Sequence, residues 1–354
     1  MHPNLLKPFY SHGPIQNLDT LAEVLEISCK QLCRLARKAN QMYRLVPQQK
    51  KDGSVRKTYD ADHALKRVQH LIKTRILSKV RYPLYLQGGI RDPENPRDYA
   101  RNAAIHAGQA CVINEDIADF YPSTTSHQVR DIWKHFFRFP AGVADCLTRL
   151  TTRRGFLPQG AKTSSYLANL VFWRTEYELV RHLAAKGLRY SRLADDITGS
   201  SSKPLTRGQK SEVISAVYSF IKRDGFSPKY RKHAIFERNE AMLVNNLVVN
   251  AHPALPVRER QAVRCLVHRA SNTLNAGNGT VSNVPLAHIK GKIGKVKRFH
   301  ARAGRRLAAT LQAALTSVQK LDGSGAHHRG RVDRDHRNAR RYDGHLHAPA
   351  PAGS

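Results

Sequence analysis

The sequence predicts an α+β protein in which helices pack against a β-sheet. Between residues 110 and 250, the segments follow the order strand, helix, helix, strand hairpin, helix, strand, which is typical of this fold class. The expected strands are short and rich in β-branched residues, whereas the expected helices repeat apolar residues every three to four positions. We therefore expect a sheet with helices on one face.

Two segments of this region define the sheet. An apolar run at 110–117 ends in acidic residues and reads as a buried strand, and a hairpin at 189–202 holds Asp195 and Asp196 in its turn. The other expected elements are helices at 129–137, at 167–186 before Gly187 and at 213–221, and short strands at 234–236 and 243–249.

The segments on either side are mainly helical in pattern. Before the sheet, 18–45 and 65–80 carry apolar stripes at helical spacing, and a polar stretch between them contains the hairpin signal Asp52-Gly53. After the sheet, 256–319 is helical in pattern and strongly basic. The end of the chain is rich in Gly, His, Arg and Pro with few large apolar residues, which predicts disorder.

Composition narrows the functional classes. The net charge of +32 favours a polyanionic partner, and nucleic acid is the leading candidate, although a merely basic soluble protein would also fit. No run of about 18 apolar residues is present and the first ten residues lack a signal-peptide core, so we expect a cytoplasmic protein without a membrane span. The five cysteines lack zinc-site spacing and are expected to be buried thiols.

Acidic residues gather at the ends of the expected strands. Asp116 lies at the end of the first expected strand and Asp119 follows it, and Asp195-Asp196 occupy the hairpin turn. Adjacent carboxylates repel one another unless a cation binds, and oxygen-rich clusters suit Mg²⁺. If the two strands are neighbours, Asp116, Asp195 and Asp196 form a candidate two-metal site, whereas an isolated Asp-Asp pair would be an ordinary solvated turn.

At this point the sequence resembles reverse transcriptases, over about residues 18–299. Residues 114–123 (NEDIADFYPS) resemble the first palm motif of the family, and residues 157–170 (LPQGAKTSSYLANL) resemble its second. Leu193-Ala194-Asp195-Asp196 stands where the YxDD box belongs, and Gly225-Phe226 followed by Lys232 is similar to the fourth motif. Three ordered motifs of this length make a specific signal.

The resemblance assigns the metal site and the sugar site. It implies that Asp116, Asp195 and Asp196 are the catalytic metal ligands, with the Ile117 carbonyl as a further ligand. The implied cofactors are two Mg²⁺ ions, with Mn²⁺ as the alternative metal. It also implies that Tyr121 lies under the incoming sugar and excludes a 2′-hydroxyl, so that dNTPs are selected; the alternative is an ordinary core tyrosine.

Further substrate-binding residues follow from the same resemblance. Asp119 and Phe120 belong to the first motif, and Gln159 and Gly160 would line the nucleotide and template site. Arg56 would grip the triphosphate through its bidentate fork, or would be a solvated surface residue. Lys232 would protonate the leaving pyrophosphate, or would simply contact phosphate.

Three short segments of the sequence resemble motifs of retron enzymes. Residues 102–106 (NAAIH) match their NAxxH element, residues 87–89 (QGG) partly match a loop, and residues 291–294 (GKIG) resemble their basic thumb helix. Several positions depart from the family pattern while the three aspartates remain. The departures are Leu193 for the tyrosine of the YxDD box, Lys162 and Ser165 for two prolines, and Val244-Asn245-Asn246 for a Val-Thr-Gly triplet.

The resemblance implies a right-hand polymerase whose palm contains an antiparallel sheet. Its expected parts are an N-terminal helical segment (1–42), fingers (43–111), palm (112–250), helical thumb (251–320) and a disordered basic tail (321–354). The expected partners are an RNA template and primer, an RNA–DNA duplex and dNTPs. For a retron-type enzyme of anti-phage defence, a dedicated noncoding RNA and an effector protein would be added.

Two other functions use the same features. A non-catalytic RNA-binding protein on a polymerase scaffold would explain the charge, but it would have no need of three repelling carboxylates. A two-metal nuclease would use the carboxylates, but it would have no evident use for Tyr121 or for Gln159-Gly160. RNA-directed DNA synthesis is therefore the function that the sequence favours.

Overall fold

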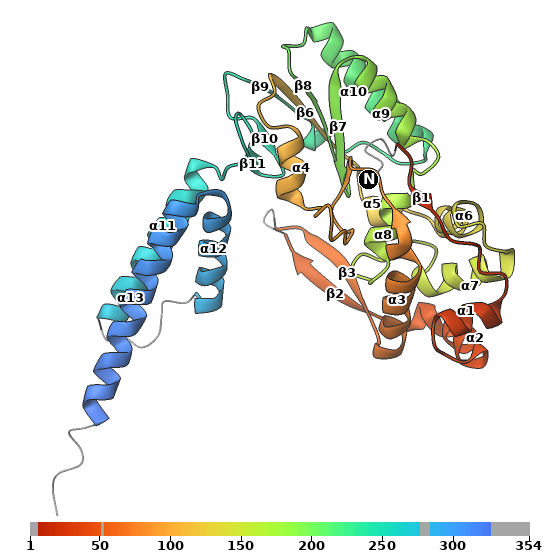
Figure 1. The fold of residues 1–354 in the computed structure, drawn as a ribbon, viewed down its shortest axis with the longest axis horizontal. Helices are drawn as coiled ribbons and strands as arrows, with labels where there is room; N and C mark the ends of the chain where they lie inside the picture. The colour runs from red at the N-terminus through yellow and green to blue at the C-terminus, as the bar shows by residue number, and fades with distance from the viewer. Residues whose placement is uncertain (1–5, 51–52, 277–283, 327–354) are drawn as a thin grey trace, which may run out of the picture. The chain divides into compact units, whose positions relative to one another are not determined.

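The computed structural model describes residues 6–50, 53–276 and 284–326. The chain divides into two compact units, one that ends at Pro256 and one that begins at Val257 (Figure 1). The first unit contains all the strands of the described chain, and the second is helical. None of the helices within the described residues is both long enough and apolar enough to cross a bilayer.

A five-stranded sheet forms the centre of the first unit. The strand order is β5-β7-β8-β6-β9, and all neighbours are antiparallel except the edge pair β5 and β7, which is parallel. The expected antiparallel sheet thus has one parallel edge strand, which sequence periodicity does not signal because that strand has only two residues. The strands are β5 Leu86–Gln87, β6 Cys111–Asp116, β7 Leu188–Leu193, β8 Asp196–Ser201 and β9 Ala234–Glu237.

Helices cover both faces of this sheet, so the expectation of helices on one face was wrong. Helices α9 (Glu176–Ala185) and α10 (Arg207–Arg223) lie side by side on one face (Figure 1). Helix α4 (Tyr99–Ile105) packs on the other face against β7 and β5. The second face carries buried polar side chains, which must have hydrogen-bond partners when they leave water.

The N-terminal part of the first unit is a helical layer with a hairpin. The region 18–45, which the sequence predicted to be helical, contains α1 (Leu18–Val24) and α2 (Cys29–Lys38), but its last residues begin a strand. The break follows from local chemistry, because Glu26 is left-handed with φ of 49° and the Ser28 side chain accepts the Gln31 N–H to begin α2. Strands β2 (Tyr43–Gln49) and β3 (Val55–Ala61) then form the expected hairpin. Asp52 of its turn lies outside the described residues.

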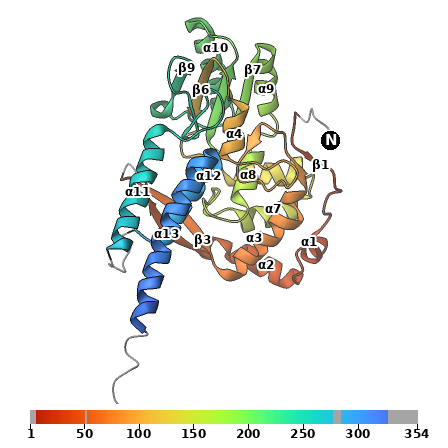
Figure 2. The same ribbon diagram turned by 60° about the vertical axis from the view of Figure 1, so that its left-hand side comes forward.

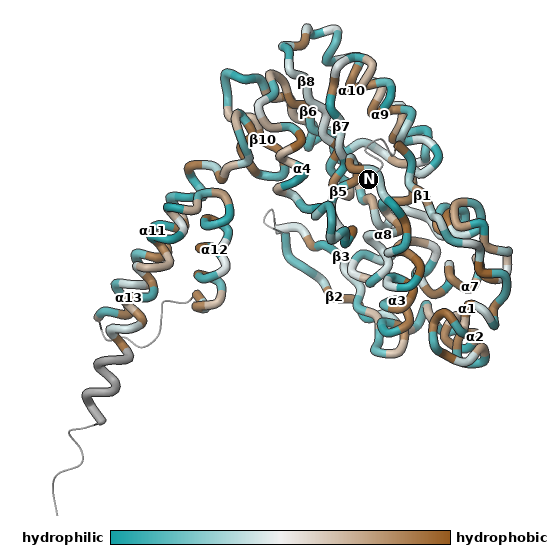
Figure 3. The backbone as a smooth tube through the Cα atoms, viewed as in Figure 1, coloured by the Kyte–Doolittle hydropathy of each residue, from teal (hydrophilic) through white to brown (hydrophobic). Residues whose placement is uncertain are grey.

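Further helices complete the core below the sheet. Helices α1, α2 and α3 pack on α7, and Figure 3 shows hydrophobic stretches in these helices. The predicted helix at 129–137 is present, but its second half is a π-helical turn, Ile132–Phe136. The remaining elements of this unit are β1 Phe9–Tyr10, α3 His63–Arg75, β4 Val80–Arg81, α5 Phe120–Ser123, α6 Ser126–Asp131, α7 Ala141–Thr151, α8 Ser164–Leu170, β10 Leu243–Val244 and β11 Leu247–Val248, with 3₁₀ turns at Ala39–Gln41, Leu77–Lys79 and Tyr230–Lys232.

The second unit consists of three helices that pack on one another. They are α11 (Val257–Asn275), α12 (Leu286–Phe299) and α13 (Ala301–Ala326). The helical prediction for 256–319 is confirmed within the described residues. Helix α13 continues through 321–326, where the sequence predicted the start of a disordered tail; the rest of that tail, 327–354, lies outside the described residues.

His106 ends α4 and is buried between two strands of the sheet. Its Nδ1 lies 2.7 Å from Ser200 Oγ and its Nε2 lies 2.7 Å from Ser191 Oγ. Burial, assisted by the nearby Arg189 charge, lowers the pKa of His106 to about 3. The folded protein therefore holds this ring neutral, whereas the unfolded chain takes up a proton below its ordinary pKa of about 6.5.

We predict that His106 makes the protein sensitive to acid. Because only the unfolded state binds this proton, stability is lost as the pH falls below about 6.5, and between pH 7.5 and pH 5 the free energy of unfolding should fall by about 2 kcal/mol through this residue. Urea unfolding of the wild type and of His106→Asn at several pH values measures the effect. The variant should lose this part of the pH dependence, and equal slopes in the two proteins would contradict the assignment.

Candidate active site

The three aspartates singled out in the sequence converge at one end of the sheet. Asp116 is the last residue of β6 and pairs directly with Asp196, the first residue of β8. The Ile117 N–H donates to the Asp195 carbonyl across a distance of 3.0 Å. Ala194 adopts a left-handed φ of 56°, which lets the chain reverse between β7 and β8 within two residues. The strand pairing thus places all three carboxylates side by side.

Electrostatics make this carboxylate cluster costly without a cation. Burial and the charge of Asp116 raise the pKa of Asp195, and burial and the charge of Asp195 raise the pKa of Asp196. The Asp116 side chain is 2% exposed, and its Oδ1 is buried without a hydrogen-bond partner. An orphaned carboxylate oxygen beside two further carboxylates is the donor set that a hard divalent cation prefers.

A lysine ammonium group lies in this cluster. Lys232 Nζ contacts Asp116 Oδ2 and lies 3.8 Å from Asp196 Oδ1, and Lys229 Nζ lies 3.6 Å from Asp116 Oδ1. Among the residues that the structure describes, no three His, Cys, Asp or Glu side chains are arranged so that they could together hold a metal ion. The Lys232 and Lys229 ammonium groups thus offset part of the negative charge of the carboxylate cluster.

Most of the expected substrate-binding residues line one cavity of about 270 Å³ beside Asp195. The cavity brings together the β2–β3 hairpin, the segment after β6 and the second motif. Lys50, Lys57 and Lys229 give it a basic character that the sequence did not single out; Lys229 stands three residues before Lys232, a spacing that could have indicated it. The expected residues that line it are Arg56, Asp119, Phe120, Tyr121, Gln159 and Asp195.

Two aromatic residues of the first motif have different environments. Tyr121 is partly exposed at the cavity, whereas Phe120 is 3% exposed and packs against Phe172 and Phe226. Phe120 is therefore mainly a core residue that supports Tyr121. Phe226 of the expected fourth motif belongs to the same aromatic cluster, so an apolar side chain is needed at this position.

Two glycines allow close approaches around the site. Gly160 lines a neighbouring cavity of about 400 Å³ together with Lys73, Arg91 and Lys162, and has a φ of 107°. A Cβ there would lie 2.9 Å from the Tyr59 carbonyl oxygen, so a side chain would push the β2–β3 hairpin away. Gly88 has a φ of 76°, and a Cβ on it would lie 2.4 Å from Leu193 Cδ1.

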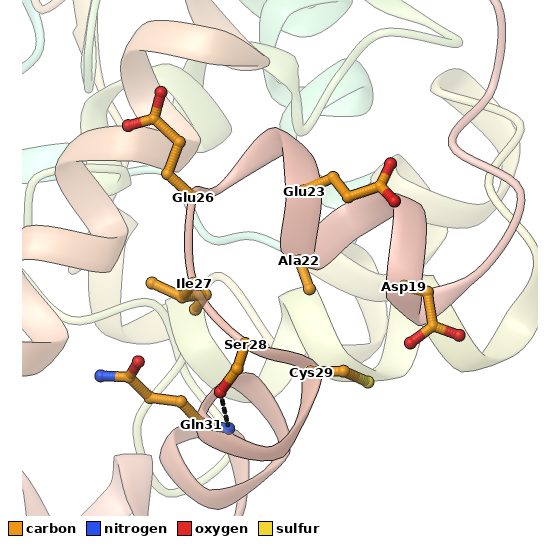
Figure 4. A pocket seen from close by; sticks show the side chains of 8 residues that line it. All are labelled: Asp19, Ala22, Glu23, Glu26, Ile27, Ser28, Cys29 and Gln31. Atoms are coloured by element: carbon orange, nitrogen blue, oxygen red, sulfur yellow. Dashed lines mark hydrogen bonds between the residues drawn. The ribbon is translucent and has the colours of Figure 1, made fainter.

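A different cavity, of about 530 Å³, lies between α1 and α2 (Figure 4). Its lining includes the exposed carboxylates of Asp19, Glu23 and Glu26 and shares no residue with the two cavities near the aspartates. Negative charge of this kind disfavours phosphate groups. The cavity therefore contains none of the residues that the sequence predicted to bind a nucleotide.

A buried ion pair supports the turn that carries Asp195, and sequence patterns did not reveal it. The Arg192 side chain is fully buried and binds both carboxylate oxygens of Glu176, at 2.6 and 2.8 Å. The same guanidinium donates to the Ala194 carbonyl at 3.0 Å and to the Asn169 carbonyl at 3.3 Å. Arg192 therefore connects the left-handed residue of the hairpin turn to α8 and α9.

Comparison with known proteins identifies the family. The chain is 35% identical over 267 residues to the Retron Se72 reverse transcriptase of Salmonella heidelberg (strain 579083-10), which covers 74% of this chain and 69% of that protein. The chain belongs to the retron reverse transcriptases. It is 29% identical over 337 residues to the Retron Ec48 reverse transcriptase of Escherichia coli, covering 91% of this chain and 82% of that protein. The Retron Ec86 reverse transcriptase of Escherichia coli is 25% identical over 314 residues, which cover 87% of this chain and 90% of that protein.

The reverse transcriptase is thus an RNA-directed DNA polymerase, as the sequence predicted. No family model matches the chain. Among solved structures, telomerase of Candida albicans shares 9% identity with a TM-score of 0.37 over 59% of this chain and 40% of that chain. Apo telomerase of Candida tropicalis shares 10% identity with a TM-score of 0.38 over 64% of this chain and 59% of that chain.

We predict that Arg192 positions the Asp195 turn in addition to stabilising the core. Arg192→Met leaves Glu176 buried without its partner and should cost about 3–5 kcal/mol of stability. The double variant Arg192→Met/Glu176→Gln removes both charges and should recover most of that loss. Because the bond to the Ala194 carbonyl is still missing, DNA synthesis by the double variant should remain at least about tenfold below wild type. Activity that recovers in step with the melting temperature would show a purely structural role.

Proposed function

We propose that this reverse transcriptase adds dNTPs to a primer by two-metal nucleotidyl transfer at Asp116, Asp195 and Asp196. The observation that carries the proposal is the direct pairing of Asp116 with Asp196 beside the basic cavity at Asp195. The three carboxylates and the Ile117 carbonyl would hold two Mg²⁺ ions, or Mn²⁺ in their place. When bound, these ions would activate the primer hydroxyl and stabilise the leaving pyrophosphate.

The residues around the cavity fit the parts of a dNTP. Arg56, Lys57 and Lys229 provide positive charge for a triphosphate, and the Arg56 fork suits phosphate oxygens. Gln159 lines the same cavity. Its backbone carbonyl accepts a hydrogen bond from the Tyr59 backbone N–H at 2.8 Å, and this bond holds the second motif against the β2–β3 hairpin. Asp119 also lines the cavity, and its left-handed φ of 44° turns the chain toward Tyr121.

Lys232 has a different expected part in the reaction. With its ammonium near Asp116 and Asp196, it would offset part of the negative charge of the cluster before metal ions bind. Displaced by them, it would lie near the leaving phosphate, where it would supply a proton or a phosphate contact. Gly160, beside Lys162 and Lys73, would border the template.

The two units suit a right-hand polymerase, with fingers at 43–111, palm at 112–250 and thumb at 251–320. The helices of the second unit are rich in Lys and Arg, which favours binding to the phosphates of an RNA–DNA duplex by charge and shape. The named relatives are retron enzymes. We therefore propose that the enzyme binds an RNA template with its primer, a dedicated noncoding RNA and an effector protein. We also propose that it acts in anti-phage defence.

We predict that Asp195→Asn/Asp196→Asn abolishes DNA synthesis without unfolding the protein. Incorporation of dNTPs on an RNA template should fall by at least about 10³-fold, because the metal ligands are lost. The melting temperature should stay equal or rise, because the substitution removes repulsion between closely spaced carboxylates. Asp145→Asn, which breaks an exposed ion pair with Arg130, is the control and should retain activity.

Synthesis at the wild-type rate by the double aspartate variant would refute the proposed site. RNA binding should survive in this variant, and a gel shift measures it. If the wild type itself binds RNA but incorporates no dNTP with Mg²⁺ or Mn²⁺, the RNA-binding alternative gains support.

We predict that the Tyr121 ring selects dNTPs over rNTPs. Tyr121→Ala should open room for a 2′-hydroxyl and raise the relative use of rNTPs by roughly 10²-fold, which corresponds to about 3 kcal/mol of lost discrimination. Tyr121→Phe keeps the ring and should keep the selectivity. Single-nucleotide incorporation with dNTP and rNTP measures both ratios, and equal selectivity in the two variants would contradict this role.

A further inference from the structure

A row of polar side chains runs along the sheet face that α4 covers. Starting at Asp116 and Asp196, it continues through Asn114 of β6 and through Thr198 and Ser200 of β8, because alternate residues of a strand share a face. Thr198 Oγ1 donates to Asn114 Oδ1 at 3.1 Å, and Ser200 Oγ lies 2.7 Å from the His106 ring. The catalytic carboxylates are thus one end of a largely buried, hydrogen-bonded polar layer.

Two elements cover this layer. Helix α4 spans β7 and β5, and the β10–β11 hairpin lies next to α4 (Figures 1 and 2). The layer also binds the hairpin directly, since Asn114 Nδ2 donates to the Leu243 carbonyl at 2.6 Å. His106 ties α4 to both strands of the catalytic hairpin through Ser191 and Ser200. The position of the β10–β11 turn is therefore fixed relative to the aspartates.

The tip of this hairpin reaches Asp196. Asn245 and Asn246 form the two-residue turn between β10 and β11, with φ values of 49° and 62°, a left-handed turn that asparagine favours. Asn245 Nδ2 donates to Asp196 Oδ2 at 3.4 Å, and Asn245 Oδ1 accepts from Asn102 Nδ2 at 2.6 Å. Asn102 is fully buried in α4. A continuous chain of side-chain hydrogen bonds thus joins α4 to Asp196.

We propose that Asn245, oriented by Asn102, is a positioning residue for Asp196. The side-chain amide of Asn245 donates a hydrogen bond to Asp196 Oδ2. The other carboxylate oxygen of Asp196, Oδ1, lies 3.8 Å from the Lys232 ammonium. Fixing one carboxylate oxygen in this way turns the other toward the cation position. Groups that hydrogen-bond to a metal-binding carboxylate change metal affinity by about tenfold when they are removed.

The chemistry of the amide suits this role. Asn245 needs an acceptor for Asn102 and a donor for Asp196 at the same time, and an amide provides both. Because the Asn245 carbonyl oxygen accepts a hydrogen bond from Asn102, the Asn245 N–H group is directed at the Asp196 carboxylate. This arrangement aligns the N–H donor without adding charge. The inference deepens the proposed function and rests on it, because it assumes that Asp196 binds the divalent ion.

Binding of Mn²⁺ to the full chain without nucleic acid or nucleotide tests the inference. Titration followed by the electron paramagnetic resonance signal of free Mn²⁺ gives the affinity directly. Asn245→Ala should weaken Mn²⁺ binding about 5- to 10-fold. Asn246→Ala is the matched control, because it removes the same side chain from the adjacent left-handed position, where the residue is exposed and no bond to Asp196 is present. The control should bind Mn²⁺ within about twofold of wild type.

Melting temperatures without metal separate positioning from folding. Both substitutions give up an asparagine in a left-handed turn and should lower the melting temperature by similar amounts. Equal loss of Mn²⁺ affinity in Asn245→Ala and Asn246→Ala would overturn the inference, because the turn alone would then explain it. Wild-type affinity in Asn245→Ala would overturn it as well.

The double variant Asn102→Ala/Asn245→Ala tests the chain of hydrogen bonds. If Asn102 acts through Asn245, Mn²⁺ affinity in the double variant should equal that of Asn245→Ala, whereas independent effects would multiply. Asp196→Asn is the reference for the proposed function. Should Asp196→Asn bind Mn²⁺ like wild type, the metal site itself would be wrong; should it lose binding while Asn245→Ala does not, only the positioning role would fail.

Discussion

The pairing of β6 with β8 is the constraint on which the active site depends. It sets Asp116 directly opposite Asp196 and places Asp195 in the adjoining turn, although Asp116 lies about 80 residues from the other two along the chain. Carboxylates held this closely repel one another and resist burial, as the raised pKa values of Asp195 and Asp196 show. The fold thus maintains a charge cluster whose natural complement is a cation, and Lys232 and Lys229 supply positive charge there.

Polar networks on both faces of the sheet hold this arrangement in place. On one face, Arg192 and Glu176 bind the hairpin turn to α8 and α9. On the other, α4 reaches the same hairpin through His106 and reaches Asp196 through Asn245. Buried groups of this kind are costly unless every partner is present, so they specify one geometry more strictly than apolar packing does. The geometry of the carboxylate cluster therefore depends on residues outside the cluster itself.

Sequence patterns anticipated the elements that bear local signals. The buried strand before Asp116, the hairpin around Asp195 and the basic C-terminal helices are present where periodicity and turn residues indicated them. The break between α1 and α2, the parallel edge strand and the cover of the second sheet face by α4 depend on local capping or on contacts between distant segments, which periodicity does not register. For the same reason Arg192 and Asn245 could not be recognised from spacing alone. The motif resemblance had singled out Arg56, Tyr121 and Gln159, and these three residues line the same cavity.

Anomalous diffraction from crystals grown with Mn²⁺, an RNA–DNA primer–template and an unreactive dNTP analogue would show where the metal ions bind. We expect Mn²⁺ peaks within coordination distance of Asp116, Asp195 and Asp196, with the Lys232 ammonium displaced from Asp116. Peaks only at other positions, or a Lys232 side chain still bound to Asp116 beside a bound nucleotide, would contradict this expectation.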